Sequence, residues 1–566
     1  MKILKLFFRF IFVSCVSYLV YYLIICFFNP IFDAKSLIFP YAMHPFDLCL
    51  KIPSVWFYIK KLFKISLFLN LLIVFNSSFS FIFPEKKYVK KKFRKQVKHT
   101  DLSLFVGNSV NTNLPIYINE KGLFQNILVT GTIGSGKTSS VMYPFCKQLM
   151  EYSKNNPQNK IGMLVLDVKG NFYNQVLEYA KEVNRLDDII VLELKGKYKY
   201  NPLHKPNLSA QVLANRLKTI MLLFSPNNVE SYWLDECEKV LSECIKLCRL
   251  YNNEYVTFKE IHKLITKDDY YIQKLDVLQK LFRSGNFDKN QMYDLYTSLH
   301  FFEKEFLTLD PRVISILKSE ITRITSTFIS NYDVLKTFSP EENLLNFTGF
   351  EEVINEGKIV VLNMNISEYE NLSKIIAAYL KLDFQSEVLM QLSSKKQIKT
   401  TAFICDEYHE YVTATDSNFF AQSREAKCIN IVATQSYSSI LNTLKDPSPV
   451  KVITQNLINK IWFRTDDLFT IEEAQKQIGK EEKHFVSKSI SENAKETNYN
   501  YLTSSLQSKN SSINESINES TNLDFVYDTN FFTQQLETFS CLSFISNGNK
   551  ILPPEKIKTI PYFKKK

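Results

Sequence analysis

The feature that most constrains this chain is a glycine-rich segment, Gly131-Thr-Ile-Gly-Ser-Gly-Lys-Thr138, which has the spacing of a phosphate-binding P-loop. The short apolar run 126–130 (NILVT) precedes it and predicts a strand, and residues 139–151 are compatible with a helix. The chain has only 13 glycines in 566 residues, so chance rarely assembles such a cluster. The segment predicts an α/β domain that binds a nucleoside triphosphate.

Each residue type in this loop has a part in the expected chemistry. Glycines allow the backbone N–H groups to point at the phosphates, and the start of the following helix adds a favourable dipole. Lys137 is predicted to reach the β- and γ-phosphates, and the Thr138 hydroxyl to bind Mg²⁺. The residues expected around the phosphates are Gly131, Thr132, Ile133, Gly134, Ser135, Gly136, Lys137, Thr138 and Ser139.

Two later buried-strand patterns end in acidic residues. The run 163–166 (MLVL) ends at Asp167, and the run 401–405 (TAFIC) ends at Asp406 and Glu407. Ligands bind at the carboxyl ends of parallel strands, so either aspartate is a candidate for Mg²⁺. Asp406 and Glu407 form the better candidate pair, because one carboxylate can hold the metal through water while the other deprotonates the attacking water. The alternative is that one of these acids caps the following helix.

A further strand pattern, 429–434 (INIVAT), ends at Gln435, whose amide is a candidate sensor of the γ-phosphate. Arg424 precedes Gln435 by eleven residues and is a candidate arginine finger for the nucleotide of a neighbouring subunit. Surface arginines are common, so spacing alone does not single out Arg424.

Two uncharged runs near the N-terminus predict a membrane anchor at the cell membrane. Residues 10–28 have about the length that crosses a hydrocarbon core as a helix, with a cleaved signal peptide as the alternative. Residues 65–84 form a second run, which asparagines and serines interrupt, so that a buried amphipathic segment is its alternative. The basic run 86–98 favours the cytoplasmic side and contact with lipid headgroups. Both termini are therefore predicted in the cytoplasm, with an external loop at 29–64.

Charge and cysteine content limit the class of partner and site. The net charge of +11 suggests an anionic partner, nucleic acid or membrane, although part of it lies in local runs. The ten cysteines lack metal-site spacing, and Cys237, Cys244 and Cys248 predict a buried stripe on one helix. No base-reading motif is present, so any DNA contact is predicted to involve phosphates, to tolerate any sequence and to weaken with salt.

Along the chain, residues 99–205 predict the first part of a motor domain and 346–566 its second part. The interval 206–345 has dense helical periodicity and predicts an inserted all-α domain, with a purely structural insertion as the alternative role. Residues 486–522 are rich in Ser, Asn, Glu and Lys and predict a flexible surface loop. The basic end 562–566 predicts a solvated tail without a function.

In their order, these motifs resemble the type IV coupling proteins of conjugation and type IV secretion, the TraG-like family. The resemblance covers nearly the whole chain and consists of the two N-terminal spans, GTIGSGKT, LVLDVKGN (164–171), Asn-Pro-Leu (201–203), Tyr232-Trp233, CDE (405–407), the Arg424 region and ATQS (433–436). Val168 stands where the family usually has Pro, and Asn171 where it usually has an acid. These departures leave the roles of Asp167 and Lys169 in doubt.

The resemblance implies a RecA-like P-loop motor domain with an inserted all-α domain, assembled as a ring, a homo-hexamer. It implies an ATPase that uses ATP and Mg²⁺ to deliver DNA–relaxase complexes or other secreted proteins to the channel proteins of a type IV secretion system. By position, it assigns the phosphate and metal contacts to Lys137 and Thr138, catalysis to Asp406 and Glu407, and the finger and sensor to Arg424 and Gln435. The alternatives are an ATP-dependent recruitment platform for secreted proteins and an FtsK-type DNA translocase, although no winged-helix module is visible after residue 480.

Overall fold

The computed structural model describes residues 57, 61, 65, 102–167, 170–224, 231–285, 287–329, 331–364, 366–394, 397–493, 498–500, 505–507 and 512–564. The chain divides into two units, Met1–Val97 and Lys98–Lys566. The predicted membrane segments 10–28 and 65–84, the loop 29–64 and the basic run 86–98 lie outside the described residues, apart from positions 57, 61 and 65. None of the helices in the described ranges is long and apolar enough to cross a membrane.

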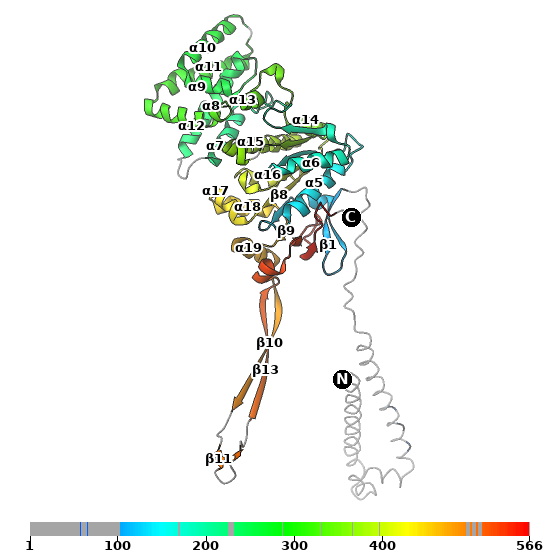
Figure 1. Cartoon of the computed structure of the whole chain (residues 1–566). Coiled ribbons are helices and arrows are strands. Elements are labelled where there is room, and N and C mark those ends of the chain that lie inside the picture. Colours follow the sequence, from blue (N-terminus) through cyan, green and yellow to red (C-terminus); the bar gives the residue numbers. More distant parts are fainter. Residues whose placement is uncertain are drawn as a thin grey trace. The chain divides into compact units, whose positions relative to one another are not determined.

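The second unit is built on a mixed sheet whose described strands follow the order β2-β1-β15-β14-β9-β3-β8-β7-β4-β6-β5 (Figure 1). The part from β9 to β5 is parallel, and β14, β15, β1 and β2 extend it with antiparallel pairings. The parallel strands are β9 (Asn459–Phe463), β3 (Ile127–Thr130), β8 (Cys428–Thr434), β7 (Thr401–Cys405), β4 (Gly162–Leu166), β6 (Ile359–Leu362) and β5 (Ile189–Leu192). The antiparallel strands are β1 (Ser103–Ser109), β2 (Pro115–Asn119), β14 (Ser540–Phe544) and β15 (Glu555–Lys558).

The parallel strands are mostly apolar and almost entirely buried because both faces of this part of the sheet are covered. In β3, Leu128 belongs to the core on one face, whereas Ile127 and Val129 belong to the core on the other. Helices α5 (Tyr143–Glu151) and α6 (Asn171–Glu182) contribute to the core of Ile127, and α7 (Ala210–Leu223) and α15 (Ile366–Ser393) to that of Leu128. The remaining short helices are α4 (Glu120–Leu123), α14 (Phe350–Glu356), α16 (Asp416–Gln422), α17 (Tyr437–Leu444), α18 (Pro447–Asn456) and α19 (Leu468–Ile478).

Between β5 and α14, every described regular element is a helix (green in Figure 1). These are α7, α8 (Ser231–Tyr251), α9 (Phe258–Thr266), α10 (Asp268–Arg283), α11 (Lys289–His300), α12 (Pro311–Thr327) and α13 (Tyr332–Phe338), with short 3-10 and π turns between them. Cys237, Cys244 and Cys248 are fully buried on α8. Their core is continuous with one face of the sheet, so these helices pack onto the sheet domain.

The prediction of a flexible loop at residues 486–522 is wrong for the part of this segment that the structure describes. Strand β10 (Lys480–Asn493) pairs antiparallel with β13 (Ser512–Phe525), in an unbroken register from Lys480 opposite Phe525 to Asn493 opposite Ser512. A smaller pair, β11 (Asn498–Asn500) and β12 (Ser505–Gln507), lies between them in the sequence. A two-stranded ribbon satisfies backbone groups by pairing and needs no apolar core, so a composition rich in Ser and Asn does not reveal it.

Candidate nucleotide site

The glycine-rich segment forms the connection between β3 and a helix that begins at Thr138. The first turn of that helix is a π turn, η3 (Thr138–Met142), and α5 continues it. Gly134 and Gly136 have φ values of +77° and +103°, a conformation that side chains other than glycine rarely adopt. A Cβ atom on Gly136 would also lie 2.6 Å from the ring of Phe539. Two independent reasons therefore make glycine necessary at position 136.

Lys137 is almost completely buried, and its side chain folds back over the loop. The ammonium nitrogen donates to the carbonyl oxygen of Gly131 at 2.5 Å and to that of Thr132 at 3.2 Å. Phosphate oxygens are charged and form stronger hydrogen bonds with an ammonium group than carbonyls do. The ammonium group is therefore held at the loop, where phosphate oxygens can replace the two carbonyls as its hydrogen-bond partners.

Asp406 follows β7, and its carboxylate meets the start of the P-loop helix. The Thr138 hydroxyl donates to Asp406 Oδ2 at 2.6 Å, although 268 residues separate them in the sequence. The pairings β3–β8 and β8–β7 place the carboxyl ends of these strands side by side. A hydroxyl and a carboxylate supply the hard oxygen ligands that Mg²⁺ prefers, so the residues fit this ion.

Burial controls the charge of Asp406. Desolvation, with further contributions from Asp167 and Glu407, raises the pKa of Asp406 to about 6, against the effect of the Thr138 hydrogen bond. The negative charges of Asp167 and Glu407 thus act on Asp406 in the protein interior, although no group of three or more His, Cys, Asp or Glu side chains in the described residues is arranged to hold a metal by itself. A divalent cation would offset the mutual repulsion of these carboxylates, which is the electrostatic reason to expect a metal there.

Glu407 lies beside this cluster in an unusual backbone conformation. Its φ is +48°, in the left-handed region that is uncommon for residues with a Cβ, and its side chain is only 6% exposed. Gln435, at the carboxyl end of β8, donates from Nε2 to Glu407 Oε2 at 3.4 Å. The structure therefore brings the candidate base and the candidate sensor into contact.

His409 is a neighbour of this pair that the sequence did not single out. Its Nδ1 lies 3.8 Å from Glu407 Oε2 and 3.2 Å from the hydroxyl oxygen of Thr434. Burial lowers the pKa of His409 despite the nearby Glu407 and Glu410 carboxylates, so the ring is neutral at pH 7. Its only sequence signal is its position two residues after Glu407.

Asp167 takes the role of a helix cap. Its Oδ2 accepts hydrogen bonds from the backbone N–H groups of Asn171 and Phe172, both at 3.0 Å, at the start of α6. Gly170, which precedes α6, has a left-handed conformation that allows this turn. The capping alternative therefore applies to Asp167, which still contributes negative charge near Asp406. Val168 and Lys169 lie outside the described residues.

Arg424 does not join the site of its own chain. It is exposed in the turn before β8, whereas Gln435 follows the other end of the same strand. The seven residues of β8 span about 23 Å in extended conformation. Arg424 therefore lies near the amino-terminal ends of the parallel strands, away from the nucleotide site at their carboxyl ends. Any contact of Arg424 with a nucleotide would have to be with that of another subunit.

Two further residues form hydrogen bonds with the loop through their backbone. The Arg464 carbonyl, at the end of β9, accepts from the backbone N–H of Thr132 at 2.8 Å, and the Phe539 N–H donates to the Ser135 carbonyl at 3.1 Å. Such contacts depend on strand pairing and not on the type of side chain. No sequence pattern could have indicated them.

The comparison with known protein families agrees with the resemblance that the sequence motifs suggest. Residues 312–524 match the family model described as the type IV secretion-system coupling protein DNA-binding domain. The expected resemblance to the type IV coupling proteins is confirmed over these residues. A comparison with the curated proteins finds no match.

Among solved structures, the chain is similar to several forms of the coupling protein TrwB. The trigonal form of TrwBdeltaN70 with sulphate matches with a TM-score of 0.53 at 10% identity, over 82% of this chain and 95% of that one. TrwB with ADP and Mg²⁺ matches with a TM-score of 0.51 at 11% identity, over 78% and 86%. TrwB with a non-hydrolysable GTP analogue gives 0.52 at 11% identity, over 80% and 89%. At these identities the likeness shows that this chain has the mixed α/β fold of TrwB.

Proposed function

We propose that this coupling protein is an ATPase whose site lies between the P-loop and the end of β7. The observation that carries the proposal is the 2.6 Å hydrogen bond from Thr138 to Asp406, with Glu407 directly beside it. A P-loop hydroxyl, a buried metal-binding carboxylate and a second carboxylate are the parts that phosphoryl transfer to water requires. Two chain segments that are far apart in the sequence supply them, the P-loop and the residues after β7.

In this proposal the residues divide the work of hydrolysis. The backbone of residues 131–138 and the Lys137 ammonium group bind the triphosphate, while Thr138 and Asp406, the latter through water, hold Mg²⁺, which offsets phosphate charge when bound. Glu407 accepts a proton from the attacking water, and Gln435 keeps the Glu407 carboxylate oriented. The products are ADP and phosphate. Asp167 supports α6 and the local negative charge but is not assigned to the metal.

We further propose that hydrolysis couples DNA or protein substrates to a type IV secretion channel at the cell membrane. The family description that residues 312–524 match names DNA binding, and TrwB is described as a conjugative coupling protein. The net charge of +11 suits sequence-tolerant phosphate contacts. The segments 10–28 and 65–84 would anchor the chain with both termini in the cytoplasm. Arg424 would reach the nucleotide of a neighbour in a homo-hexamer, whose ring would receive a relaxase-bound DNA or another secreted protein.

The test is ATP hydrolysis by the chain purified in detergent, with single- or double-stranded DNA over a salt series. Lys137→Ala is the blank, because it removes the ammonium group that contacts the phosphates. Turnover that DNA stimulates, that salt diminishes and that the variant lacks supports a DNA-coupled motor. Turnover that DNA leaves unchanged would favour recruitment of secreted proteins, and turnover that survives in the variant would contradict the assigned site.

The arginine-finger proposal has its own test in mixed assemblies. Subunits with Lys137→Ala have an intact Arg424 but a defective P-loop, and subunits with Arg424→Ala have the reverse. Mixing two inactive variants should restore part of the turnover if Arg424 acts across the subunit interface. Mixed assemblies that stay as inactive as either variant alone would argue against this role.

A further inference from the structure

The C-terminal residues, for which the sequence predicts a solvated tail, contact the P-loop region through several hydrogen bonds. The Tyr562 N–H donates to the carbonyl of Ser139 at 2.9 Å, and the Thr559 hydroxyl donates to the Ser140 hydroxyl at 2.8 Å. The Thr559 N–H also donates to the carbonyl of Phe539, whose own N–H bonds Ser135. The end of the chain is therefore fixed to the first turn of the P-loop helix.

Three aromatic rings gather at this contact, and we call Phe539, Tyr562 and Phe563 the aromatic corner. The ring centroids of Phe539 and Phe563 are 6.0 Å apart, and those of Tyr562 and Phe563 are 5.5 Å apart. Tyr562 also packs edge-on against Tyr143 of α5 at 5.2 Å. The corner is thus held against the helix that starts at the phosphate-binding loop.

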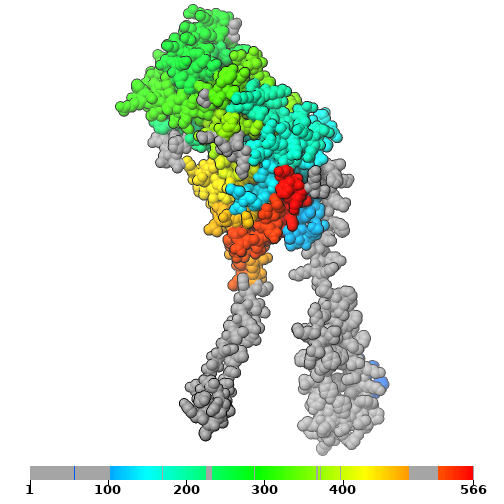
Figure 2. All heavy atoms as spheres, viewed as in Figure 1, coloured from blue at the N-terminus to red at the C-terminus, as the bar shows by residue number. Residues whose placement is uncertain are grey.

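The aromatic corner is not a core, because its outer rings remain exposed. Phe563 is 57% exposed and Tyr562 44%, whereas the Phe539 ring lies against Gly136. Figure 2 shows the C-terminal residues (red) at the surface beside the blue and cyan segments that carry β1 and α5. Exposed large aromatic rings grouped at one place on a soluble domain indicate a binding surface.

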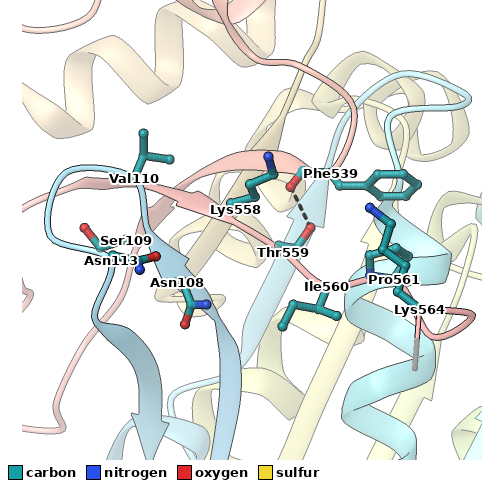
Figure 3. A pocket seen from close by; sticks show the side chains of 10 residues that line it. All are labelled: Asn108, Ser109, Val110, Asn113, Phe539, Lys558, Thr559, Ile560, Pro561 and Lys564. Atoms are coloured by element: carbon teal, nitrogen blue, oxygen red, sulfur yellow. Dashed lines mark hydrogen bonds between the residues drawn. The ribbon is translucent and has the colours of Figure 1, made fainter. Parts of the chain in front are cut away.

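An open pocket of about 340 Å³ borders the same corner (Figure 3). Phe539 and Lys564 lie at one end of it, and the side chains of Asn108, Ser109 and Asn113 lie at the other. Its size falls within the range of small-molecule sites, and its lining combines apolar, amide and cationic groups. Space for part of a ligand therefore exists directly beside the Phe539 ring, which lies against Gly136 of the P-loop.

We propose that the aromatic corner is the site for the base of the bound nucleotide, which stacks on the Phe563 ring with Lys564 close by. The inference rests on the nucleotide binding proposed above. The loop binds the phosphates, so the base must leave the site next to the start of the helix, where the corner is fixed to Ser139 and Gly136. Stacking on an aromatic ring accepts any base, since every base has a π face. The corner therefore favours nucleotides over inorganic polyphosphate without selecting adenine from guanine.

The test compares ligands with and without a base on the chain purified in detergent. Dissociation constants for ATP, GTP and inorganic tripolyphosphate are measured by calorimetry for Phe563→Leu, Phe563→Tyr and Tyr293→Ala. Leucine keeps an apolar side chain but removes the π face, whereas tyrosine retains it. Tyr293 is an exposed aromatic residue of α11 and serves as the matched control.

We expect Phe563→Leu to weaken ATP and GTP binding by about 5- to 100-fold, the range that base–aromatic stacking supplies, and to leave tripolyphosphate binding unchanged. Phe563→Tyr and Tyr293→Ala should match the unaltered chain with all three ligands. Equal weakening of all three ligands in Phe563→Leu would show that the corner only supports the loop, and no weakening would show that it makes no contact. Either result overturns the inference. Binding of tripolyphosphate that survives Lys137→Ala would instead contradict the proposed nucleotide site itself.

Discussion

Two buried aspartates of the motor domain have opposite surroundings. Asp383, on α15, is fully buried and lies 2.7 Å from both Lys205 Nζ and Arg216 Nη1, with the Tyr200 hydroxyl donating to the same carboxylate. Burial raises its pKa, but Lys205 and Arg216 outweigh burial and hold the pKa below its usual value. Asp406 is equally buried, yet its charged neighbours include Asp167 and Glu407, and its pKa rises to about 6.

The difference separates a structural carboxylate from a functional one. Two cations and a phenol neutralise Asp383, so its ionised form completes a packed network that needs no ligand. Asp406 faces other carboxylates and a hydroxyl, an arrangement that is unfavourable alone and becomes favourable with a divalent cation. A buried carboxylate whose pKa burial and neighbouring carboxylates raise is therefore the stronger indicator of a site.

Among the substitutions considered, we expect the largest effect from Glu407→Gln, on the rate of ATP hydrolysis. Glu407→Gln should lower single-turnover ATP hydrolysis by about 10²- to 10⁴-fold, because it removes the general base while preserving size. Nucleotide affinity should change by less than about threefold, since the assigned phosphate ligands are intact. Quench-flow measures the rate of hydrolysis, and calorimetry measures nucleotide affinity, so the two effects can be separated. A loss of both in equal measure would mean that Glu407 maintains the fold of the site.

Asp383→Asn should act on stability and not on chemistry. Lys205 and Arg216 would remain buried without their counter-ion, which costs about 3 kcal/mol of unfolding free energy. Urea unfolding measures this loss, and turnover per folded molecule should stay close to that of the unaltered chain. A folded variant that no longer hydrolyses ATP would break the distinction between the two aspartates.

Lys460, on β9, is a buried cation that can be compared with the two buried aspartates. It is completely buried, its ammonium group donates to the carbonyls of Thr454 and Leu457, and burial lowers its pKa to about 7. Between pH 7 and 10 the unfolded chain therefore binds more protons at this residue than the folded chain. Stability should rise with pH in that window by up to about 1.4 kcal/mol per unit.

Lys460→Met provides the control for this pH effect, because it keeps the length of the side chain without a titrating group. Unfolding midpoints at pH 7, 8 and 9 should rise in the unaltered chain relative to the variant. Parallel pH profiles for the two proteins would mean that Lys460 stays protonated in the fold.

Arg424 gives the smallest expected effect on folding. Its side chain is exposed before β8, so Arg424→Ala should change the unfolding free energy by no more than about 0.5 kcal/mol. Denaturation measured beside the mixed-assembly test checks this. A large loss of stability would mean that Arg424 holds its own turn, and its effect on turnover could not then be assigned to a neighbour.

Much of the site was accessible from the sequence because its parts obey local rules. The P-loop spacing identifies Lys137 and Thr138, and apolar runs that end in a polar residue identify Asp406 and Gln435 at the carboxyl ends of strands. Both Asp406 and Asp167 follow a buried strand, so local rules favoured Asp406 only because a second carboxylate, Glu407, comes directly after it. Only the position of α6 showed that Asp167 Oδ2 accepts hydrogen bonds from two backbone N–H groups.

The sequence by itself determined that the runs before the P-loop, Asp167, Asp406 and Gln435 are strands and which side chains can meet a phosphate, because periodicity and spacing act over a few residues. It did not determine the pairing of β10 with β13, whose composition is that of a loop, or the position of His409. The aromatic corner is the clearest case, since Phe539 and Gly136 are 403 positions apart and meet because β14, which follows Phe539, joins the sheet beside β9. Strand order is a property of the whole chain, in which distant apolar surfaces are buried together, and it decides which distant residues become neighbours.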